Sequence, residues 1–561
     1  MNSSHSGNSG HLSGNSGNPG HSEYSGEVGH TASVAAGAAT TDLSATDSGA
    51  AGAATAGSRV TVAVVGTGTM GQGIAQVALA AGHPVLLHDV AEGFAVRAAG
   101  TIGARLDRLV EKGRMTAERR DAARAAITPV TGLEQLASAG LVIEAVAERL
   151  EVKQRLFADL EDVVGDDCVL ATNTSSLSVT AIAGALRRPE RFLGLHFFNP
   201  APLLPLVEVV SGHATDPAVA DFGYETALGW GKTPVRCTDT PGFVVNRVAR
   251  PFYAEAFAAL EDRVADPATI DAVLREGGGF RMGPFELTDL IGQDVNEAVT
   301  RSVWEAFFQS PKFTPSLAQR RLVESGRHGR KSGAGWFRYD EHHGGGGADG
   351  PVPHTAPPRT PPARVGFTDG PPPVRELVGV IEKAGIGVDR DEAAGHGVIT
   401  LPGGARLTLA DGTYAADGGG DTVQYDLALD YAAAIRIAIA HAPGARAAAV
   451  DEAIGLFQAL GKQVSVVRDS PGLIVARTVA MLVDFAADAV AKGVATPQDV
   501  DTAMRLGVNY PLGPVEWGTR LTPGWVRDVL RALHVHHPTG RYAPSVGLSR
   551  WYASPEGVLS S

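Results

Sequence analysis

The chain has 561 residues, which is too long for one hydrophobic core, so we expect several domains. Its formal net charge of −13 argues against a nonspecific nucleic-acid binder, which needs a basic surface to displace counterions from phosphates. It has two cysteines, and no apolar run approaches the roughly 18 residues that span a bilayer, so we expect no disulfide framework, no metal site, no membrane association and a cytoplasmic location.

Residues 1–57 consist mainly of Ser, Gly, His, Asn and Ala, and they contain almost no large apolar side chains. Such a segment cannot bury enough surface to offset the entropy of ordering it. It also lacks a charged start followed by an apolar core, the pattern of a secretory signal. We therefore predict a disordered tail.

Residues 58–237 alternate short β-branched runs with segments of helical spacing, which indicates an α/β domain. The predicted strands cover 60–65, 85–89, 141–146, 168–172 and 191–196. Helices are predicted from about 75 to 82 and from 153 to 160. This alternation favours an open, mostly parallel, doubly wound sheet of the Rossmann type.

A glycine-rich turn follows the first predicted strand and opens the first predicted helix. Gly66-Thr-Gly68-Thr-Met-Gly71 has the spacing of a dinucleotide-binding loop, in which backbone N–H groups at the helix start bind the pyrophosphate. The motif alone is weak, but its position between strand and helix is the context that it requires. The candidate cofactor contacts in this loop are Gly66, Gly68, Thr69, Met70 and Gly71.

Asp89 ends the second predicted strand, 23 residues after Gly66. A carboxylate at that point accepts bonds from the adenosine ribose hydroxyls and repels a 2′-phosphate, so it favours NAD over NADP. The alternative is an aspartate that only ends a strand.

The second half of the chain is predicted to contain two helical domains. The first covers 238–340, with helices at 246–260, 267–276 and 289–308. A linker rich in Gly and Pro is predicted at 341–373, followed by a small α/β unit at 374–467. The second helical domain covers 468–561.

An internal repeat supports this division. Asp239-Thr-Pro-Gly-Phe-Val-Val-Asn-Arg247 returns 230 residues later as Asp469-Ser-Pro-Gly-Leu-Ile-Val-Ala-Arg477. The same offset aligns Gly283-Pro-Phe-Glu286 with Gly513-Pro-Val-Glu516. Because one register holds over many identities, we infer two copies of one helical domain, and the second is degenerate because Ala476 replaces Asn246.

Several polar side chains follow predicted strand ends, where ligands sit in open α/β sheets. A single histidine is more often structural than catalytic, but here His196 has company that can converge on one point. The residues concerned are Ser175, His196, Asn199, Glu208 and Asn246. The structural alternatives are a helix cap for Ser175 and a domain-junction bond for Asn246.

Taken together, these motifs resemble the L-3-hydroxyacyl-CoA dehydrogenase family over residues 59–340. The quoted pieces are Gly66-Thr-Gly-Thr-Met-Gly-Gln-Gly-Ile-Ala75, Glu144-Ala-Val-Ala-Glu148, Asn173-Thr-Ser-Ser176, His196-Phe-Phe-Asn-Pro200 and Gly329-Arg-Lys-Ser-Gly-Ala-Gly335-Trp. The resemblance implies NAD-dependent, reversible oxidation of (S)-3-hydroxyacyl-CoA to 3-oxoacyl-CoA. It also implies a reduced Rossmann-like unit before the second helical copy, as in longer bacterial 3-hydroxybutyryl-CoA or 3-hydroxyadipyl-CoA dehydrogenases.

The resemblance further implies a role for each matching position. His196 is the expected general base, oriented by Glu208, and an imidazole can both take and give a proton near neutral pH. Ser175 and Asn246 are expected around the substrate oxygen, with Asn199 as a further substrate contact. The positions expected near the cofactor are Glu148, Lys153 and Asn173. Lys153 could instead lie on a solvated helix face.

The expected partners follow from the same resemblance. Lys112 and Arg108 are candidate contacts for the CoA phosphates, although ordinary solvated helix charge is an equal alternative. We expect one active site per chain and an intrachain pseudo-dimer of the two helical copies. Lipid oxidation, butyrate metabolism and aromatic-acid breakdown such as phenylacetate degradation all use such chemistry. The alternatives are a dehydrogenase of a free hydroxy or sugar acid, or a nonenzymatic NAD-binding protein.

Overall fold

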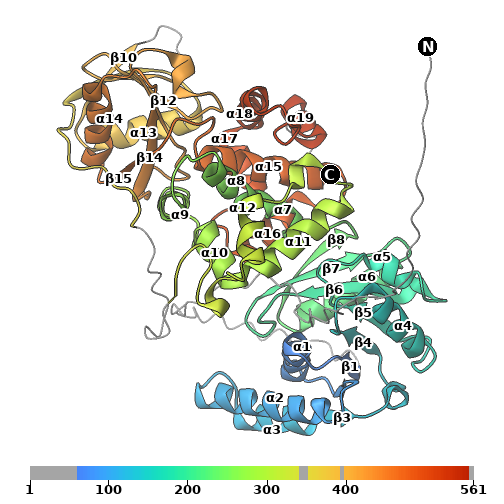
Figure 1. Cartoon of the computed structure of the whole chain (residues 1–561). Helices are drawn as coiled ribbons and strands as arrows, with labels where there is room; N and C mark the ends of the chain where they lie inside the picture. The colour runs from blue at the N-terminus through green and yellow to red at the C-terminus, as the bar shows by residue number, and fades with distance from the viewer. Residues whose placement is uncertain (1–59, 340–351, 392–396, 555–561) are drawn as a thin grey trace, which may run out of the picture.

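The computed structural model describes residues 60–339, 352–391 and 397–554. Two β-sheets lie at opposite ends of the molecule, with two sets of helices between them (Figure 1). The tail predicted at 1–57 and the first part of the predicted linker, 341–351, lie outside the described residues. Within the described ranges, every helix is too short or too polar to cross a membrane.

The first sheet has eight strands in the order β3-β2-β1-β4-β5-β6-β7-β8. The first six in this order run parallel, β7 is antiparallel to β6, and β8 is parallel to β7. This confirms the Rossmann-type sheet. Its strands are β1 Val62–Val65, β2 Val85–His88, β3 Ile127–Val130, β4 Leu141–Glu144, β5 Val169–Thr172, β6 Phe192–Phe197, β7 Leu206–Ser211 and β8 Thr233–Thr238.

Helices cover both faces of this sheet. Val62 and Val64 of β1 pack into one core with α1 and α2, while Ala63 and Val65 pack into another with α4 and α5. Successive residues of a strand point to opposite faces, so a doubly covered sheet needs a continuous apolar run, as found in β1. The helices of this part are α1 Thr69–Ala80, α2 Phe94–Glu111, α3 Ala117–Ala125, α4 Leu150–Glu161, α5 Val179–Ala183 and α6 Pro217–Gly229.

The edge strand β3 was not expected from the sequence, because it contains Pro129 and most of its side chains are partly or fully exposed. Such strands lack the continuous apolar run of a central strand, and proline is tolerated only at sheet edges.

The first helical region contains more breaks than expected. The helix predicted at 289–308 is two helices, because Gly292 between them adopts φ of 104°. The helix predicted at 246–260 is likewise a short helix followed by a longer one. The bounds are α7 Val245–Val248, α8 Arg250–Glu261, α9 Pro267–Glu276, α10 Pro284–Ile291, α11 Gln293–Ala306 and α12 Leu317–Glu324.

The second sheet has the order β10-β9-β11-β12-β13-β14-β15. Its elements are β9 Arg364–Thr368, α13 Pro372–Lys383, β10 Gly387–Asp391, β11 Ile399–Thr400, β12 Arg406–Leu409, β13 Thr422–Tyr425, β14 Arg436–His441, α14 Ala447–Ala459 and β15 Gln463–Val466. The helices that follow are α15 Val475–Ala491, α16 Pro497–Val508, α17 Pro514–Leu521, α18 Pro523–His536 and α19 Val546–Ala553.

The prediction of a linker is wrong for the C-terminal part of 341–373, because β9 and the start of α13 lie there. The small α/β unit therefore begins before residue 374. Gly and Pro dominate the composition there, but Val365 and Phe367 alternate with more exposed neighbours and enter the core. The alternation of buried and more exposed side chains is that of a β-strand, and the neighbouring strands pair with it despite the Gly and Pro residues around it.

The 230-residue repeat extends into the sheets. The bounds of β7 and α6 return, shifted by 230, as those of β14 and α14. The antiparallel pairing of β6 with β7 likewise returns as that of β13 with β14. The small unit is therefore a second copy of the last part of the first α/β domain as well as a neighbour of the second helical domain.

The two copies exchange contacts. Helix α16 of the second copy packs on β7, β8 and α7 of the first, and α9 of the first packs on β14 of the second. The backbone repeats this relation: the Thr238 N–H donates to the Val494 carbonyl at 2.9 Å, and the Arg468 N–H donates to the Val264 carbonyl at 2.9 Å. Equivalent groups thus meet across the seam, which is the pattern of a two-fold interface.

Candidate active site

His196 and Glu208 face each other across the antiparallel strands β6 and β7. They are direct partners in the strand register, and His196 Nδ1 lies 2.6 Å from Glu208 Oε2. Both side chains are buried, with 2 % and 0 % of their surface exposed. The two residues that the sequence predicted to form a pair are therefore in contact.

Glu208 also binds the start of the first helical region. Its Oε1 accepts the backbone N–H groups of Val244 and Val245 at 3.0 and 2.9 Å. Each carboxylate oxygen thus has its own partner, one the imidazole and the other the N-terminal end of α7. This satisfies a buried charge that would otherwise be costly, and it fixes the position of Asn246 relative to the histidine.

The other ring nitrogen of His196 faces no protein group. Nε2 is buried and has no hydrogen-bond partner among the described residues. The rings of Phe198 and Phe243 lie 4.5 and 5.8 Å from the imidazole and pack around it. A buried, unpartnered ring nitrogen next to a carboxylate-bound one is the arrangement that a proton-transferring histidine requires.

Asn246 and Ser175 join the helical region to the sheet next to this pair. Asn246 Nδ2 donates to the Ser175 carbonyl at 3.4 Å, while Asn246 Oδ1 is buried without a partner within the described part of the chain. Both residues are almost completely buried. The contact supports the predicted convergence of these two residues and also agrees with the domain-junction alternative for Asn246.

Asn173 and Asn199 take different positions. Asn173 follows β5, and its Oδ1 accepts the Phe197 N–H at 2.8 Å, so its side chain ties the ends of β5 and β6 together. Asn199 lies two residues beyond β6 and is half-buried, next to Pro200. The structure thus gives Asn173 a scaffolding bond in addition to any cofactor contact.

The glycine loop has the shape that a pyrophosphate needs. Gly66 adopts φ of 93°, and a side chain on Gly71 would lie 1.8 Å from the Gly66 carbonyl oxygen. At Gly68 a side chain would meet nothing within 4 Å, so this position opens onto free space. The start of α1 carries no side-chain cap, which leaves its first N–H groups available to an anion.

Asp89 lies beside this loop. Its Oδ2 accepts the Thr67 backbone N–H at 2.8 Å and the Thr67 hydroxyl at 2.7 Å, and its Oδ1 accepts the Ala91 N–H at 3.0 Å. These bonds hold the carboxylate at the mouth of the loop. The sequence analysis did not single out Thr67, because it occupies a variable position of the glycine motif. The one available sign was that Thr67 lies just after the first strand and Asp89 just after the second, so that neighbouring parallel strands bring them together.

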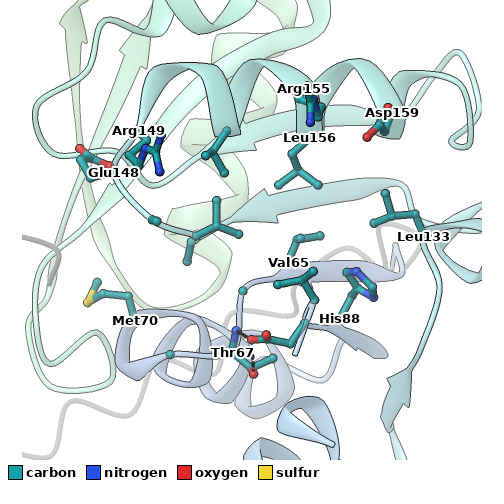
Figure 2. A pocket seen from close by; sticks show the side chains of 18 of the residues that line it. Val65, Thr67, Met70, His88, Leu133, Glu148, Arg149, Arg155, Leu156 and Asp159 are labelled. Carbon is teal, nitrogen blue, oxygen red and sulfur yellow. Dashed lines mark hydrogen bonds between the residues drawn. The ribbon is translucent and has the colours of Figure 1, made fainter. Parts of the chain in front are cut away.

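A cavity of about 920 Å³ runs along the loop. Figure 2 shows α4, with Arg155, Leu156 and Asp159, on one side of it and Thr67 and Met70 on the other. Asp89 and Glu148 also line it, so the cavity extends from the second strand to the first residues before α4. Its volume lies within the range of cofactor pockets, roughly 300–1,000 Å³.

Glu148 connects this cavity to the polar residues near His196. Its Oε1 accepts bonds from the Thr174 hydroxyl, the Ser175 and Ser176 N–H groups and the Ser176 hydroxyl. Burial alone raises the pKa of Glu148, but the charge of Lys153 and the bonds from Thr174 and Ser176 hold it below its usual value. Glu148 is thus an ionised group that lies between the cofactor cavity and Ser175.

Lys153 is buried rather than exposed on a helix face, so the solvated alternative is wrong. Its side chain is 1 % exposed, and Nζ lies 2.6 Å from Glu144 Oε1 and 3.2 Å from Glu148 Oε2. The sequence did not assign a role to Glu144, because a carboxylate at a strand end shows no partner until the fold brings α4 next to it.

Lys112 and Arg108, the candidate contacts for the CoA phosphates, lie at the C-terminal end of α2. Lys112 caps the end of α2 and is exposed, as is Arg108. Arg120 and Arg124 pair with Asp107 at 2.9 and 2.7 Å. Lys112 has no described contact with the residues around His196.

Comparison with known proteins agrees with this geometry. Residues 61–240 match the NAD binding domain of 3-hydroxyacyl-CoA dehydrogenase, and residues 242–339 and 472–556 match its C-terminal domain. Residues 407–471 match the 3-hydroxybutyryl-CoA dehydrogenase reduced Rossmann-fold domain. Two copies of the helical domain and a reduced unit between them are therefore seen in both sequence and structure.

Individual relatives cover most of the chain or half of it. The 3-hydroxyadipyl-CoA dehydrogenase of Escherichia coli K12 is 46% identical over 490 residues, 86% of this chain and 95% of that one. A crystal structure described as 3-hydroxybutyryl-CoA dehydrogenase of the same organism has a TM-score of 0.79 and 44% identity and covers 89% of this chain and 99% of that one. The 3-hydroxybutyryl-CoA dehydrogenase of Mycobacterium tuberculosis is 41% identical over 280 residues, 50% of this chain and 98% of that one.

The family's first domain binds NAD, and this chain has the glycine loop, the open start of α1 and the adjoining cavity that NAD requires. The helical domain and the reduced unit extend the match over most of the remaining chain. The chain therefore belongs to the 3-hydroxyacyl-CoA dehydrogenase family of NAD-dependent oxidoreductases.

Proposed function

We propose that the chain oxidises (S)-3-hydroxyacyl-CoA to 3-oxoacyl-CoA reversibly, with His196 as general base and Glu208 as the residue that orients it. The observation that carries this proposal is the asymmetry of the imidazole: Nδ1 is held by Glu208, while Nε2 is buried and unpartnered in the described structure. That nitrogen is available to a substrate hydroxyl. A carboxylate on Nδ1 keeps the proton there and stabilises the imidazolium once it forms.

In this mechanism His196 Nε2 takes the proton of the 3-hydroxyl group as the C3–H bond breaks. Bound NAD supplies the hydride acceptor. In the reverse direction the imidazolium returns the proton to the ketone oxygen. The dyad needs no movement of its strands for this, because β6 and β7 hold both side chains in register.

Ser175 and Asn246 are proposed to position the substrate oxygen. Their mutual contact places an amide group, with an unpartnered Oδ1, next to the end of β5. Asn246 Oδ1 can accept a hydrogen bond from the substrate hydroxyl, and a polar group that is already oriented in a buried site positions such a hydroxyl better than water does. Asn199, beyond β6, is proposed as a further substrate contact.

The cofactor contacts follow from the cavity. We assign the pyrophosphate to the loop formed by Gly66, Gly68, Thr69, Met70 and Gly71, of which the first four line the cavity. The adenosine ribose is assigned to Asp89, and the nicotinamide end to Glu148 with Lys153 and Asn173 behind it. Lys112 is proposed to meet the CoA phosphates.

The acyl group is proposed to be short. The relatives that cover most of the chain carry the names 3-hydroxyadipyl-CoA and 3-hydroxybutyryl-CoA dehydrogenase. These substrates differ in length and in a terminal carboxylate.

The two helical copies are proposed to act as an intrachain pseudo-dimer with one active site. Helix α16 packs on β7 and α7, the elements that carry Glu208 and Asn246, so the second copy supports the first site. The second copy cannot support the same reaction, because Ala476 occupies the position of Asn246.

A substrate panel tests the proposed function. Formation of NADH is followed with 3-hydroxybutyryl-CoA, 3-hydroxyadipyl-CoA, a long-chain 3-hydroxyacyl-CoA and the corresponding free 3-hydroxy acids. We expect turnover of a short CoA ester and none of the free acids. Equal turnover of a free acid would instead establish a hydroxy-acid dehydrogenase and overturn the CoA assignment.

A further inference from the structure

A second cavity lies between the two helical copies, apart from the site described above. It has a volume of about 330 Å³. The first copy lines it with α8, Thr300 of α11 and residues between 311 and 319. The second copy lines it with Arg477 of α15 and residues between 537 and 542. Its lining includes neither His196 nor Asn246, nor any residue of the first sheet.

The side chains around this cavity have unused nitrogen atoms. Arg250 Nε and His537 Nε2 are buried and have no hydrogen-bond partner in the described part of the chain, and Arg477 Nη1 forms no hydrogen bond but lies 3.8 Å from Asp262 Oδ2. The arginine nitrogens can only donate, so they need an acceptor. Leaving a buried donor unpaired is unfavourable, and most such groups in proteins are satisfied by some partner.

Arg250 is the most unusual of the three. It is 3 % exposed, its Nη1 donates to the Thr300 hydroxyl at 3.1 Å, and its guanidinium lies 5.0 Å from the centre of the Tyr253 ring. Among the described residues no carboxylate forms an ion pair with it. Burial accordingly lowers its pKa. A buried cation without a counter-charge strongly favours a ligand that brings one.

Two carboxylates, Glu261 and Asp262, line the cavity, and a third, Glu255, is bonded to its arginines; each has at least one partner. Glu255 accepts bonds from both Arg477 and Arg541 and from the Tyr542 hydroxyl. Asp262 lies 3.8 Å from Arg477. Glu261 accepts the Ser316 hydroxyl and the Ala318 N–H at the start of α12. Every unpartnered buried side-chain atom in the described lining is therefore a nitrogen.

The repeat does not preserve this chemistry. At the 230-residue offset, Arg250 corresponds to Ala480 and Arg541 to Pro311. Arg477 is matched by Arg247, but Arg250 and Arg541 have no basic equivalent across the pseudo-two-fold seam, whereas the backbone bonds of the seam occur in pairs. The interface between the two copies therefore forms on the other side of the seam without an arginine at the positions of Arg250 and Arg541.

We propose that this cavity binds a small free oxyanion of the phosphate or carboxylate class, with Arg250 as the principal contact. Arginine suits such ligands because its fork of N–H groups matches two oxygens at once. The volume is at the small end of the range for ligand pockets, which fits an inorganic or short organic anion rather than a nucleotide. This proposal does not depend on the reaction that the chain catalyses.

The test uses the full chain with saturating NAD, so that the pyrophosphate loop is filled. Inorganic phosphate and adipate are added at constant ionic strength, with chloride as the reference anion. We expect one of them to raise the thermal unfolding midpoint by roughly 2 °C or more. Calorimetric titration of the same sample should give one anion per chain. If neither anion binds, the proposal is wrong.

Arg250→Met assigns the effect to the cavity. It removes the unpaired charge, so we expect the anion response to vanish, the anion Kd to weaken at least roughly tenfold, and the midpoint without anion to be unchanged or higher. Arg375→Met is the matched control, because that exposed arginine pairs with Asp369 elsewhere and should leave the response intact. A response that survives Arg250→Met overturns the proposal.

Two further measurements keep the outcome clear. If Arg250→Met does not fold, His537→Gln is used, and it should weaken the anion Kd severalfold; an unchanged Kd contradicts the site. The second measurement compares KM for 3-hydroxyadipyl-CoA and 3-hydroxybutyryl-CoA in Arg250→Met. A tenfold rise confined to the dicarboxylic substrate would mean that the cavity binds the acyl end and not a free anion.

Discussion

Asp426 occupies in the second copy the position that His196 occupies in the first. The two residues are 230 positions apart and follow the same strand pairing, since the Asp426 N–H donates to the Ala438 carbonyl at 2.9 Å where His196 faces Glu208. The proposed base His196 and its partner Glu208 in the first copy thus correspond to Asp426 and Ala438 in the second.

Only the structural role has survived in the second copy. The Asp426 carboxylate accepts the N–H groups of Ile474, Val475 and Ala476 at the start of α15, as Glu208 accepts those of Val244 and Val245 at the start of α7. Burial, opposed by these N–H groups, raises the pKa of Asp426 to about 6. A carboxylate that links sheet to helix is common to both copies, while the imidazole occurs in only one of them.

The first prediction concerns the base. His196→Gln should lower kcat by a factor on the order of 10²–10⁴, because glutamine cannot take the hydroxyl proton. The affinity for NADH should not change, since His196 does not line the cofactor cavity. Steady-state kinetics and a fluorescence titration with NADH measure the two quantities. Full activity in this variant would remove the proposed base.

The second prediction separates the two roles of Glu208. Glu208→Ala leaves the N–H groups of Val244 and Val245 without their acceptor, at a cost of about 1–3 kcal/mol each. Glu208→Gln keeps an acceptor and should be less destabilised, but its amide no longer favours the proton on Nδ1, so kcat should fall on the order of 10²–10⁴.

Thermal unfolding and kinetics of both Glu208 variants provide the check. A Gln variant with native kcat would show that the carboxylate only supports the helix. An Ala variant as stable as the native chain would show that the bonds to α7 contribute nothing.

The third prediction concerns cofactor choice. Asp89→Ser should raise KM for NAD and lower the preference for NAD over NADP by roughly tenfold or more, because the ribose loses an ionised acceptor and the 2′-phosphate loses its repulsion. Thr67→Val is the matched variant: it keeps the carboxylate but removes a bond that holds it, and should have a smaller effect. An unchanged preference in Asp89→Ser would contradict the assignment.

The fourth prediction concerns Lys153. Lys153→Met leaves Glu144 and Glu148 buried without their cation, which should lower the free energy of unfolding by about 3–5 kcal/mol near neutral pH. Because the folded pKa of Glu148 lies below its unfolded value of about 4.3, its stabilising contribution is present above that pH and is lost as the pH falls through the folded pKa.

The difference between the native chain and Lys153→Met should therefore narrow as the pH falls, because Glu148 without Lys153 loses the charge that lowers its pKa and takes up a proton at a higher pH than in the native chain. Lys492→Met, which removes an exposed pair with Asp488, is the control and should change stability little at any pH. A gap that stays constant with pH would contradict the proposed coupling.

The fifth prediction concerns the second copy. A chain ending at residue 339 loses α15 and α16, which pack on α8 and on β7. The exposed apolar surface should cause aggregation or a tight dimer of truncated chains, as expected for large unpaired patches. Light scattering after gel filtration measures the outcome. A monodisperse, fully active monomer would contradict the pseudo-dimer.

Part of the fold could be predicted because its signals are local. The β-branched run before Gly66, the spacing of the glycines and the position of Asp89 lie within about thirty residues of each other, and short-range patterns of this kind indicate a strand, a turn and a helix directly. The strand β9 was missed because its signal is not local: the segment around it is rich in Gly and Pro, and its hydrogen bonds come from β10 and β11.

The repeat was visible where identities remained, as in Asp239 and Asp469, and invisible where only geometry remained. His196 and Asp426 are chemically unlike, so a sequence comparison does not identify them as equivalent. Their equivalence became evident only from matching strand pairs and from helix starts bound in the same way.

The sequence by itself determined the sheet type, the glycine loop and the duplicated helical domain, and it predicted His196 and Glu208 as the base and its partner. Only the tertiary structure decided that Glu208 also caps α7, that Lys153 is buried between two carboxylates, and that Arg250 is buried with no ion pair among the described residues. The physical reason is that burial and pairing depend on elements that are far apart in the chain. The residue type of a charged side chain does not show whether water, a carboxylate or a cavity lies next to it.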